Sequence, residues 1–205
     1  MMENSLLNIL PFLLAMDLII PFLLAPTYKG YNHLTQVMSV LGNSKSPLHL
    51  IYNIWLVVFG VATFISSLQL FATVARTSNL ISTLLSSVIM IYAIGGCILS
   101  GSFSVGETKN IKTLSAKIHG YGSAIGFSLL AFAPLLIGLY FFKISNEWLG
   151  MLSFICFVLA IGFFVLFVMA DKPKYRGTIL AWEGLWQRLS LLSMYLPIVG
   201  LCYWK

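Results

Sequence analysis

Charged side chains are scarce in this chain. Charged residues occupy 9% of its 205 positions, whereas soluble domains carry about 25%. Hydrophobic residues occupy 59% of the positions, a share too large for the surface of a soluble protein to remain polar. These proportions exclude a soluble globular domain and indicate an integral membrane protein.

Metal-binding clusters and familiar catalytic signatures are missing. None of the three cysteines belongs to a CxxC pair, and no HExxH, GxSxG or phosphate-binding glycine loop occurs. Haem held by two histidines would need a second histidine on a span besides His119, but His33 and His49 lie in or beside a loop. We therefore expect no bound metal and no cofactor.

Positive charge is not gathered on one face of the chain. The net charge of +6 comes from Lys and Arg spread over loops between apolar stretches. A nucleic-acid-binding domain would instead carry a basic patch or stripe. We expect membrane lipids, and no nucleic acid, as partners.

Long apolar stretches occupy most of the chain. Six of them have about 20 residues or more, enough for a helix to cross a hydrocarbon core of about 30 Å. The alternation typical of a β-barrel is missing. We predict an all-α integral membrane protein, a single bundle over residues 1–205 whose six transmembrane helices are residues 6–25, 49–75, 80–103, 118–142, 148–170 and 180–204.

The loops between these spans differ in length and charge. The longest, residues 26–47, contains a segment of mixed polarity, Tyr31 to Leu41, that favours a short helix along the interface. The first, third and fifth loops, with Arg188, carry nine Lys and Arg residues, and the remaining loops and the C-terminus carry three. Because basic loops stay in the cytoplasm, we predict a multi-pass plasma-membrane protein with both termini outside the cytoplasm.

Ionisable residues inside the predicted spans need an explanation, because each costs about 2.5–3.5 kcal/mol to insert. Asp17 lies near the middle of the first span, where it is either a ligand or proton site or a structural hydrogen-bond partner of another helix. His119 opens the fourth span and lies on nearly the same side as Ser123 and Gly126, in a stretch where Gly122 and Gly126 form a GxxxG face. Their GxxxG spacing predicts a close crossing with another helix, and the histidine is either a bonded residue in that crossing or part of a site.

The last span begins with an unusually polar stretch. Glu183 and Gln187 are four residues apart and share one helix face, and Arg188 follows them. Snorkelling toward the interface explains Arg188 alone but not all three. By the predicted topology, Glu107 and His119 lie at the same membrane border, so these residues are candidates for lining a polar pocket open to one leaflet.

Several short motifs occur in a definite order along nearly the whole chain: Ser39-Val-Leu-Gly42 with Pro47, Asn53 and Gly60, the glycine-rich Gly95 to Gly101, His119-Gly120, and Gln187-Arg188. This order resembles a family of bacterial and archaeal six-span proteins known as domain of unknown function nine-nine-eight. Where the family usually has an acidic residue in the first loop, this chain has Val40. A more distant resemblance, to eukaryotic six-span proteins of the autophagy-modulator group linked to lipid distribution or lipid-anchor remodelling, is an analogy of fold alone.

The resemblance ranks His119, Arg188, Gln187, Ser39 and Asn53 above Asp17 as site residues. Three functions remain open. One is lipid handling, in which Arg188 binds an anionic head group of a lipid or other amphipathic ligand, because guanidinium bonds two phosphate oxygens at once.

The second function is that of an intramembrane enzyme acting on a lipid or isoprenoid substrate, with His119 as general base and Glu183 or Glu107 as its partner. The third is a transporter or proton-coupled carrier built around Asp17, although the two halves of the chain lack the matching broken helices of many transporters. The oligomeric state is left open.

Overall fold

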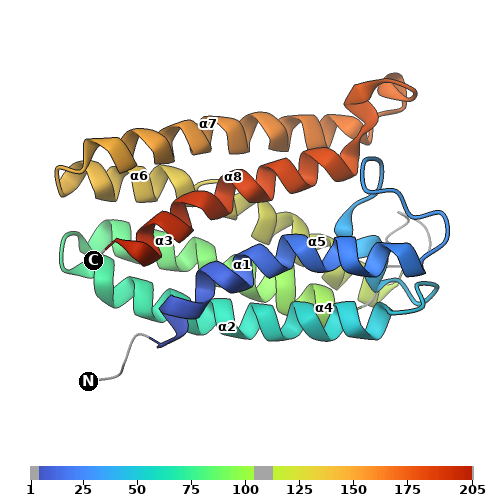
Figure 1. Ribbon diagram of the computed structural model, residues 1–205, viewed down its shortest axis with the longest axis horizontal. Coiled ribbons are helices and arrows are strands. Elements are labelled where there is room, and N and C mark those ends of the chain that lie inside the picture. Colours follow the sequence, from blue (N-terminus) through green and yellow to red (C-terminus); the bar gives the residue numbers. More distant parts are fainter. Residues whose placement is uncertain (1–4, 104–112, 205) are drawn as a thin grey trace.

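The computed structural model describes residues 5–103 and 113–204, and all regular structure within them is helical. Six spans in these residues are long and apolar enough to cross a membrane, which confirms the predicted all-α, six-span fold. In Figure 1 the long helices run along the long axis of the molecule, and the start of α1 lies at the same end as the finish of α8. Four of the spans are single helices: α1 (Ser5–Leu24), α2 (His49–Ala75), α7 (Glu147–Ala170) and α8 (Glu183–Tyr203).

The third span changes helix type part way along. Its middle segment is a π-helix, a rare form that recurs at functional sites. Just after it, the Ser100 hydroxyl donates a hydrogen bond of 3.0 Å to the carbonyl oxygen of Gly95, which lies within the π-helix. The three successive segments are α3 (Asn79–Ile91), the π-helix η3 (Tyr92–Leu99) and α4 (Ser100–Ser102).

The fourth span is broken into α5 (Leu114–Leu130) and α6 (Ala133–Lys143). Pro134 lies at the start of α6, where its missing N–H removes no intrahelical hydrogen bond. The last span begins at Glu183 rather than at residue 180, because the chain before it forms two separate 3-10 turns, η4 (Pro173–Tyr175) and η5 (Ile179–Ala181).

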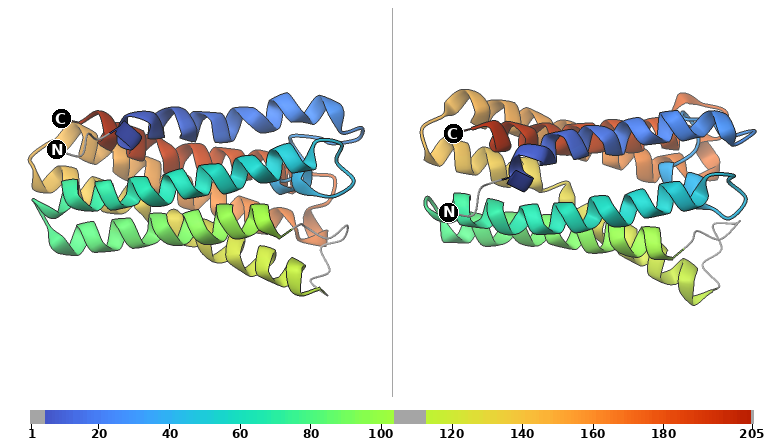
Figure 2. Two further views of the ribbon diagram at one scale, coloured as in Figure 1. Left: turned by 90° about the horizontal axis from the view of Figure 1, so that it is seen from below. Right: turned by 60° about the horizontal axis from the view of Figure 1, so that its bottom comes forward.

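Glycines bring α5 close to the π-helix. A Cβ on Gly95 would collide with the backbone of Gly122, and one on Gly126 would lie 2.8 Å from the backbone nitrogen of Gly96. The close crossing predicted from the GxxxG spacing is therefore confirmed. Beyond it, α5 leans away from the rest of the bundle at the end that carries the first loop (Figure 2).

The outer surface of the bundle is apolar. Along α2, Leu50, Ile54 and Val58 are 63%, 63% and 53% exposed and fall at four-residue spacing, so they form one outward stripe. An apolar surface of this extent suits lipid rather than water. The charged ends and apolar flanks of the spans therefore agree with a bilayer around the bundle.

The first loop folds back into the bundle. Only Met38–Gly42 (η2) and the turn Ala25–Thr27 (η1) are helical there, both as 3-10 turns. Met38 and Leu41 are buried, at 4% and 1% exposure. The interfacial helix expected over this loop is thus not found, because its apolar side chains pack into the end of the bundle instead of lying along the membrane surface.

Candidate functional site

A cavity of about 550 Å³ lies inside the bundle at the end where α8 begins. Its walls come from the first loop and from the second to sixth spans. The first span, α1, contributes the carboxylate of Asp17. Residues of α5 and residues of α8 both line it, and α5 leans outward at this end (Figure 2). The cavity brings together five of the residues singled out from the sequence: Asp17, Ser39, His119, Glu183 and Gln187.

The cavity extends from the membrane border to the middle of the bundle. Glu183 is the first residue of α8, and Tyr195, which hydrogen-bonds the cavity residue Asp17, lies twelve residues later. Twelve residues of helix measure about 18 Å, and the hydrocarbon of one leaflet is about 15 Å deep. The cavity is therefore about as deep as one leaflet.

The lining changes along this depth. Asp171, Lys172 and Glu183 lie at the mouth, where α7 ends and α8 begins. Apolar side chains form the middle, and Asp17 and Tyr92 lie at the inner end. The middle is lined by Leu56, Phe127, Phe167 and Leu191.

His119 is buried in the cavity wall at 8% exposure. Its Nδ1 lies 3.1 Å from the carbonyl oxygen of Ser100 and 3.0 Å from that of Phe103. Both oxygens can only accept, so Nδ1 carries the proton and Nε2 keeps its lone pair. Among the residues that the structure describes, no carboxylate bonds this imidazole, and Ser39 does not bond it either.

Gln187 connects the cavity to the first loop. Its side-chain oxygen accepts a hydrogen bond of 2.8 Å from the backbone N–H of Met38. Met38 and Ser39 line the cavity beside it. The amide oxygen of Gln187 is thus fixed by the loop, and its amide hydrogens remain for a molecule in the cavity.

Arg188 holds the first loop against α8 instead of lining the cavity. Its Nη1 donates to the carbonyl oxygens of His33 and Gly184, both at 2.8 Å, and its Nη2 donates to the Tyr31 hydroxyl at 2.7 Å. The guanidinium also lies over the ring of Phe22, 5.6 Å from its centre. At 8% exposure it is buried, so a head group would find only Nε–H, itself buried without a partner.

The charge of Arg188 affects the titration of the loop. Burial lowers the pKa of His33, and the positive charge of Arg188 lowers it further. The Nδ1 atom of His33 lies 3.3 Å from Nη2 of Arg188, a donor, so this nitrogen is unprotonated. Burial raises the pKa of Tyr31, with Arg188 acting in the opposite direction.

Gly184 allows this docking, and the sequence reasoning missed it. A Cβ at this position would collide with the carbonyl oxygens of Gln36 and His33. Next to it, the backbone N–H of Leu185 donates to the carbonyl oxygen of Leu34 at 3.0 Å. Glycine is a poor helix former. Its presence in the first turn of α8 could therefore have indicated that another backbone segment approaches closely there.

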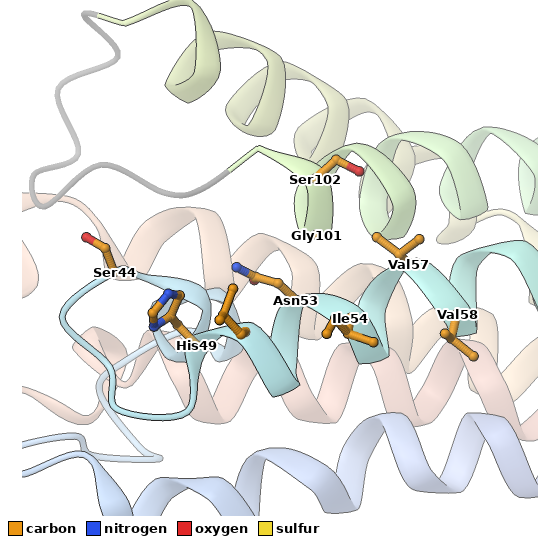
Figure 3. Close-up of a pocket in the computed structure, with 9 residues that line it drawn as sticks. Ser44, His49, Asn53, Ile54, Val57, Val58, Gly101 and Ser102 are labelled. Atoms are coloured by element: carbon orange, nitrogen blue, oxygen red, sulfur yellow. The ribbon is translucent and has the colours of Figure 1, made fainter.

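Asn53 lies outside the cavity, in a second pocket of about 460 Å³ between α2 and α4. Figure 3 shows it beside Gly101, with Ile54 and Val58 further along the same helix. Its side-chain nitrogen donates to the carbonyl oxygen of Gly42 at 3.1 Å, so it ties the first loop to α2. Glu107 lies outside the described residues.

Asp17 is buried among aromatic donors at 2% exposure. Its Oδ1 accepts from the indole N–H of Trp55 at 3.3 Å, and its Oδ2 accepts from the Tyr195 hydroxyl at 2.9 Å. The Tyr195 hydroxyl is also bonded to that of Tyr92. Within residues 5–103 and 113–204, neither Lys nor Arg bonds this carboxylate, and no group of three or more His, Cys, Asp and Glu is placed to hold a metal ion.

Comparison with known proteins gave one match. A family model described as a protein of unknown function, DUF998, matches residues 14–204. It confirms the resemblance drawn from the short motifs. Neither the curated proteins nor the solved structures gave a match.

Proposed function

Since the chain belongs to the DUF998 family of proteins of unknown function, we propose its function from the cavity: it binds one lipid-like amphipathic molecule between α5 and α8. The observation that carries the proposal is the size and lining of this cavity. Its volume of about 550 Å³ falls within the range of ligand pockets, about 300–1,000 Å³. The apolar middle suits a hydrocarbon chain, and the polar mouth suits a head group.

Three side chains would bind the head group. Gln187 offers its amide hydrogens, His119 offers Nε2 as an acceptor, and Lys172, exposed at the mouth, offers a positive charge. Arg188, which the sequence favoured for this role, is left out because the first loop and Gly184 occupy its Nη donors.

The molecule enters sideways from the bilayer. The outward lean of α5 separates it from the other helices at the mouth (Figure 2). Ala124 lines the cavity and is also exposed on the outer surface, so the wall at α5 is thin. A lipid-like molecule would therefore pass between α5 and its neighbours without crossing water.

Native mass spectrometry of the protein, purified in mild detergent from its membrane, tests this proposal. Leu191 lines the cavity at 3% exposure, whereas its neighbour Leu192 faces outward at 42%. Leu191→Trp fills the cavity and should reduce the lipid-bound fraction by about tenfold or more, a loss of at least about 1.4 kcal/mol in binding. Leu192→Trp should retain as much lipid as the wild type.

Equal retention by the wild type and Leu191→Trp would refute the proposal. If Leu191→Trp does not fold, a second matched pair replaces it. Ala124→Trp narrows the cavity from α5, and Ala72→Trp places the same side chain on the exposed face of α2.

A second function is favoured by one observation, the fixed tautomer of His119. Two carbonyl oxygens hold the Nδ1 proton, so Nε2 is oriented as a general base toward a bound molecule. We propose this activity only as an addition to binding. It is tested by mass spectrometry of lipids incubated with wild type and His119→Asn: a product formed by the wild type alone would support it, and identical lipid profiles would exclude it.

A further inference from the structure

We propose that the inner end of the cavity is a site for a positively charged group, so that the ligand carries a cationic group on the end of its apolar body that is opposite the head group at the mouth. This inference rests on the proposed function, since it requires the cavity to hold a ligand. The residue that carries the proposal is Asp17, which lines the cavity at its inner end.

The Asp17 carboxylate has acceptor capacity left over. A carboxylate offers about four lone-pair positions. Trp55 and Tyr195 occupy one on each oxygen. The indole N–H can only donate, so Oδ1 acts as an acceptor in the observed arrangement.

The described residues supply no positive charge to Asp17. Its two hydrogen-bond partners are neutral. Arg188, the buried cation of α8, is directed to the first loop and its carbonyl oxygens. A carboxylate inside a membrane bundle requires a partner of opposite charge or a proton, and a cation in the cavity provides that partner.

Aromatic side chains lie near Asp17. Tyr92 and Tyr52 line the cavity together with Asp17. The ring of Tyr195 meets those of Tyr92 and Phe59 edge to face, with centres 6.3 and 6.4 Å apart. Ring faces attract cations, and most strongly where water is excluded. The combination of a carboxylate and aromatic rings is the chemistry that recognises an ammonium or phosphonium group.

The position of the site restricts the ligand further. Between the mouth and Asp17 the lining is apolar, with Leu56, Phe127 and Leu191. A small hydrated cation would lose its water there without compensation. The cation that fits is one whose charge is carried by an apolar body.

Two ions of nearly equal size and opposite charge test the inference. Tetraphenylphosphonium and tetraphenylborate are each titrated into detergent-solubilised wild type, Asp17→Asn and Leu191→Trp, with bound ion measured by equilibrium dialysis. Partition into micelles is common to all three proteins and cancels in the differences. We expect Asp17→Asn to weaken phosphonium binding by about tenfold or more, because the Coulombic attraction between carboxylate and cation is lost, and to leave borate binding unchanged or stronger.

The outcomes separate this inference from the proposed function. If Leu191→Trp weakens binding of both ions while Asp17→Asn alters neither, the cavity is a ligand site without charge preference, and the inference is overturned. If Leu191→Trp alters neither ion, the proposed function fails as well. If Asp17→Asn does not fold, the wild type alone provides the test. The ion bound by Leu191→Trp is subtracted from the ion bound by the wild type, and equal remaining binding of borate and phosphonium would overturn the inference.

Discussion

Among single residues, Arg188 shows how one buried cation positions a distant loop. Its Nη atoms contact residues about 150 positions earlier in the chain, mostly through backbone carbonyl oxygens. Such acceptors carry no sequence signal, because every residue has a carbonyl group. The sequence therefore identified Arg188 as a residue needing an explanation but could not assign its partners.

Removing Arg188 should destabilise the folded protein. Arg188→Ala removes the guanidinium bonds to the His33 carbonyl oxygen and the Tyr31 hydroxyl, which should cost about 2–4 kcal/mol. Arg176, exposed in the loop before α8, is the matched control, and Arg176→Ala should change stability by less than about 0.5 kcal/mol. Thermal unfolding in micelles measures both, and equal melting temperatures for the two variants would contradict the docking role.

Substitutions of His119 should distinguish the structural role of Nδ1 from the ligand-binding role of Nε2. Asn places a side-chain N–H near the position of Nδ1, so His119→Asn should keep the bonds to Ser100 and Phe103 and remain within about 1 kcal/mol of the wild type. His119→Leu removes the donor that both carbonyl oxygens share and should cost about 1–3 kcal/mol. Neither Asn nor Leu has a nitrogen at the position of Nε2, so both variants should retain less lipid than the wild type in native mass spectrometry.

Thermal unfolding of the two His119 variants provides the check. If Asn destabilises the protein as much as Leu does, donation from Nδ1 is not what holds this ring. If His119→Asn retains lipid like the wild type, Nε2 does not contact the ligand.

Among the elements, the long helices were predictable and the irregular segments were not. Spans follow from apolar length alone, which is why α2 and α7 agree with their predicted ranges within a residue at each end. The π-helix η3 packs closely against α5 at Gly122 and Gly126, and apolar length does not indicate its change of helix type. Likewise, the first loop is shaped by its docking onto α8 and not by its own polarity.

Docking of the first loop should weaken in acid. Burial and Arg188 lower the pKa of His33 in the folded protein, below the value of about 6.5 expected in the unfolded chain. The unfolded chain therefore binds the proton more readily, and the stability present above about pH 6.5 falls as the pH drops toward the folded-state pKa. Protonation would also place a second positive charge 3.3 Å from the Arg188 guanidinium.

Melting temperatures of wild type and His33→Gln between about pH 5 and 8 measure this effect. Gln cannot titrate, so the wild type should lose more stability than the variant on acidification. Parallel curves for the two proteins would mean that His33 has no part in the pH response. After correction for the intrinsic pH dependence of exchange, the protection of the backbone amides in the first loop should fall on acidification over the same range in the wild type.

At the scale of the whole molecule, the membrane orientation is still a prediction from loop charge. If the basic loops are cytoplasmic, the cavity mouth at Lys172 opens toward the cytoplasmic leaflet. The candidate site was partly predictable at this scale, because topology places Glu183 and His119 at one border. That Asp17 belongs to the same site was not predictable, because its position depends on how α1 packs against α2 and α8.

Thiol labelling in intact cells tests the orientation. Lys174 and Arg76 lie exposed at opposite ends of the bundle, and wild-type protein with its native thiols is the blank. An impermeant maleimide should label Arg76→Cys and should label Lys174→Cys only after the membrane is opened. The reverse labelling pattern would place the termini in the cytoplasm and the cavity mouth at the outer leaflet.

The central claim, that the cavity between α5 and α8 holds a ligand, is tested most directly by a cryo-electron microscopy map of the protein in lipid nanodiscs. We expect elongated density from Gln187 to Asp17 that touches Leu191 and matches none of the side chains. A map in which the side chains close the space, or in which it contains only separate water-sized peaks, would contradict the claim.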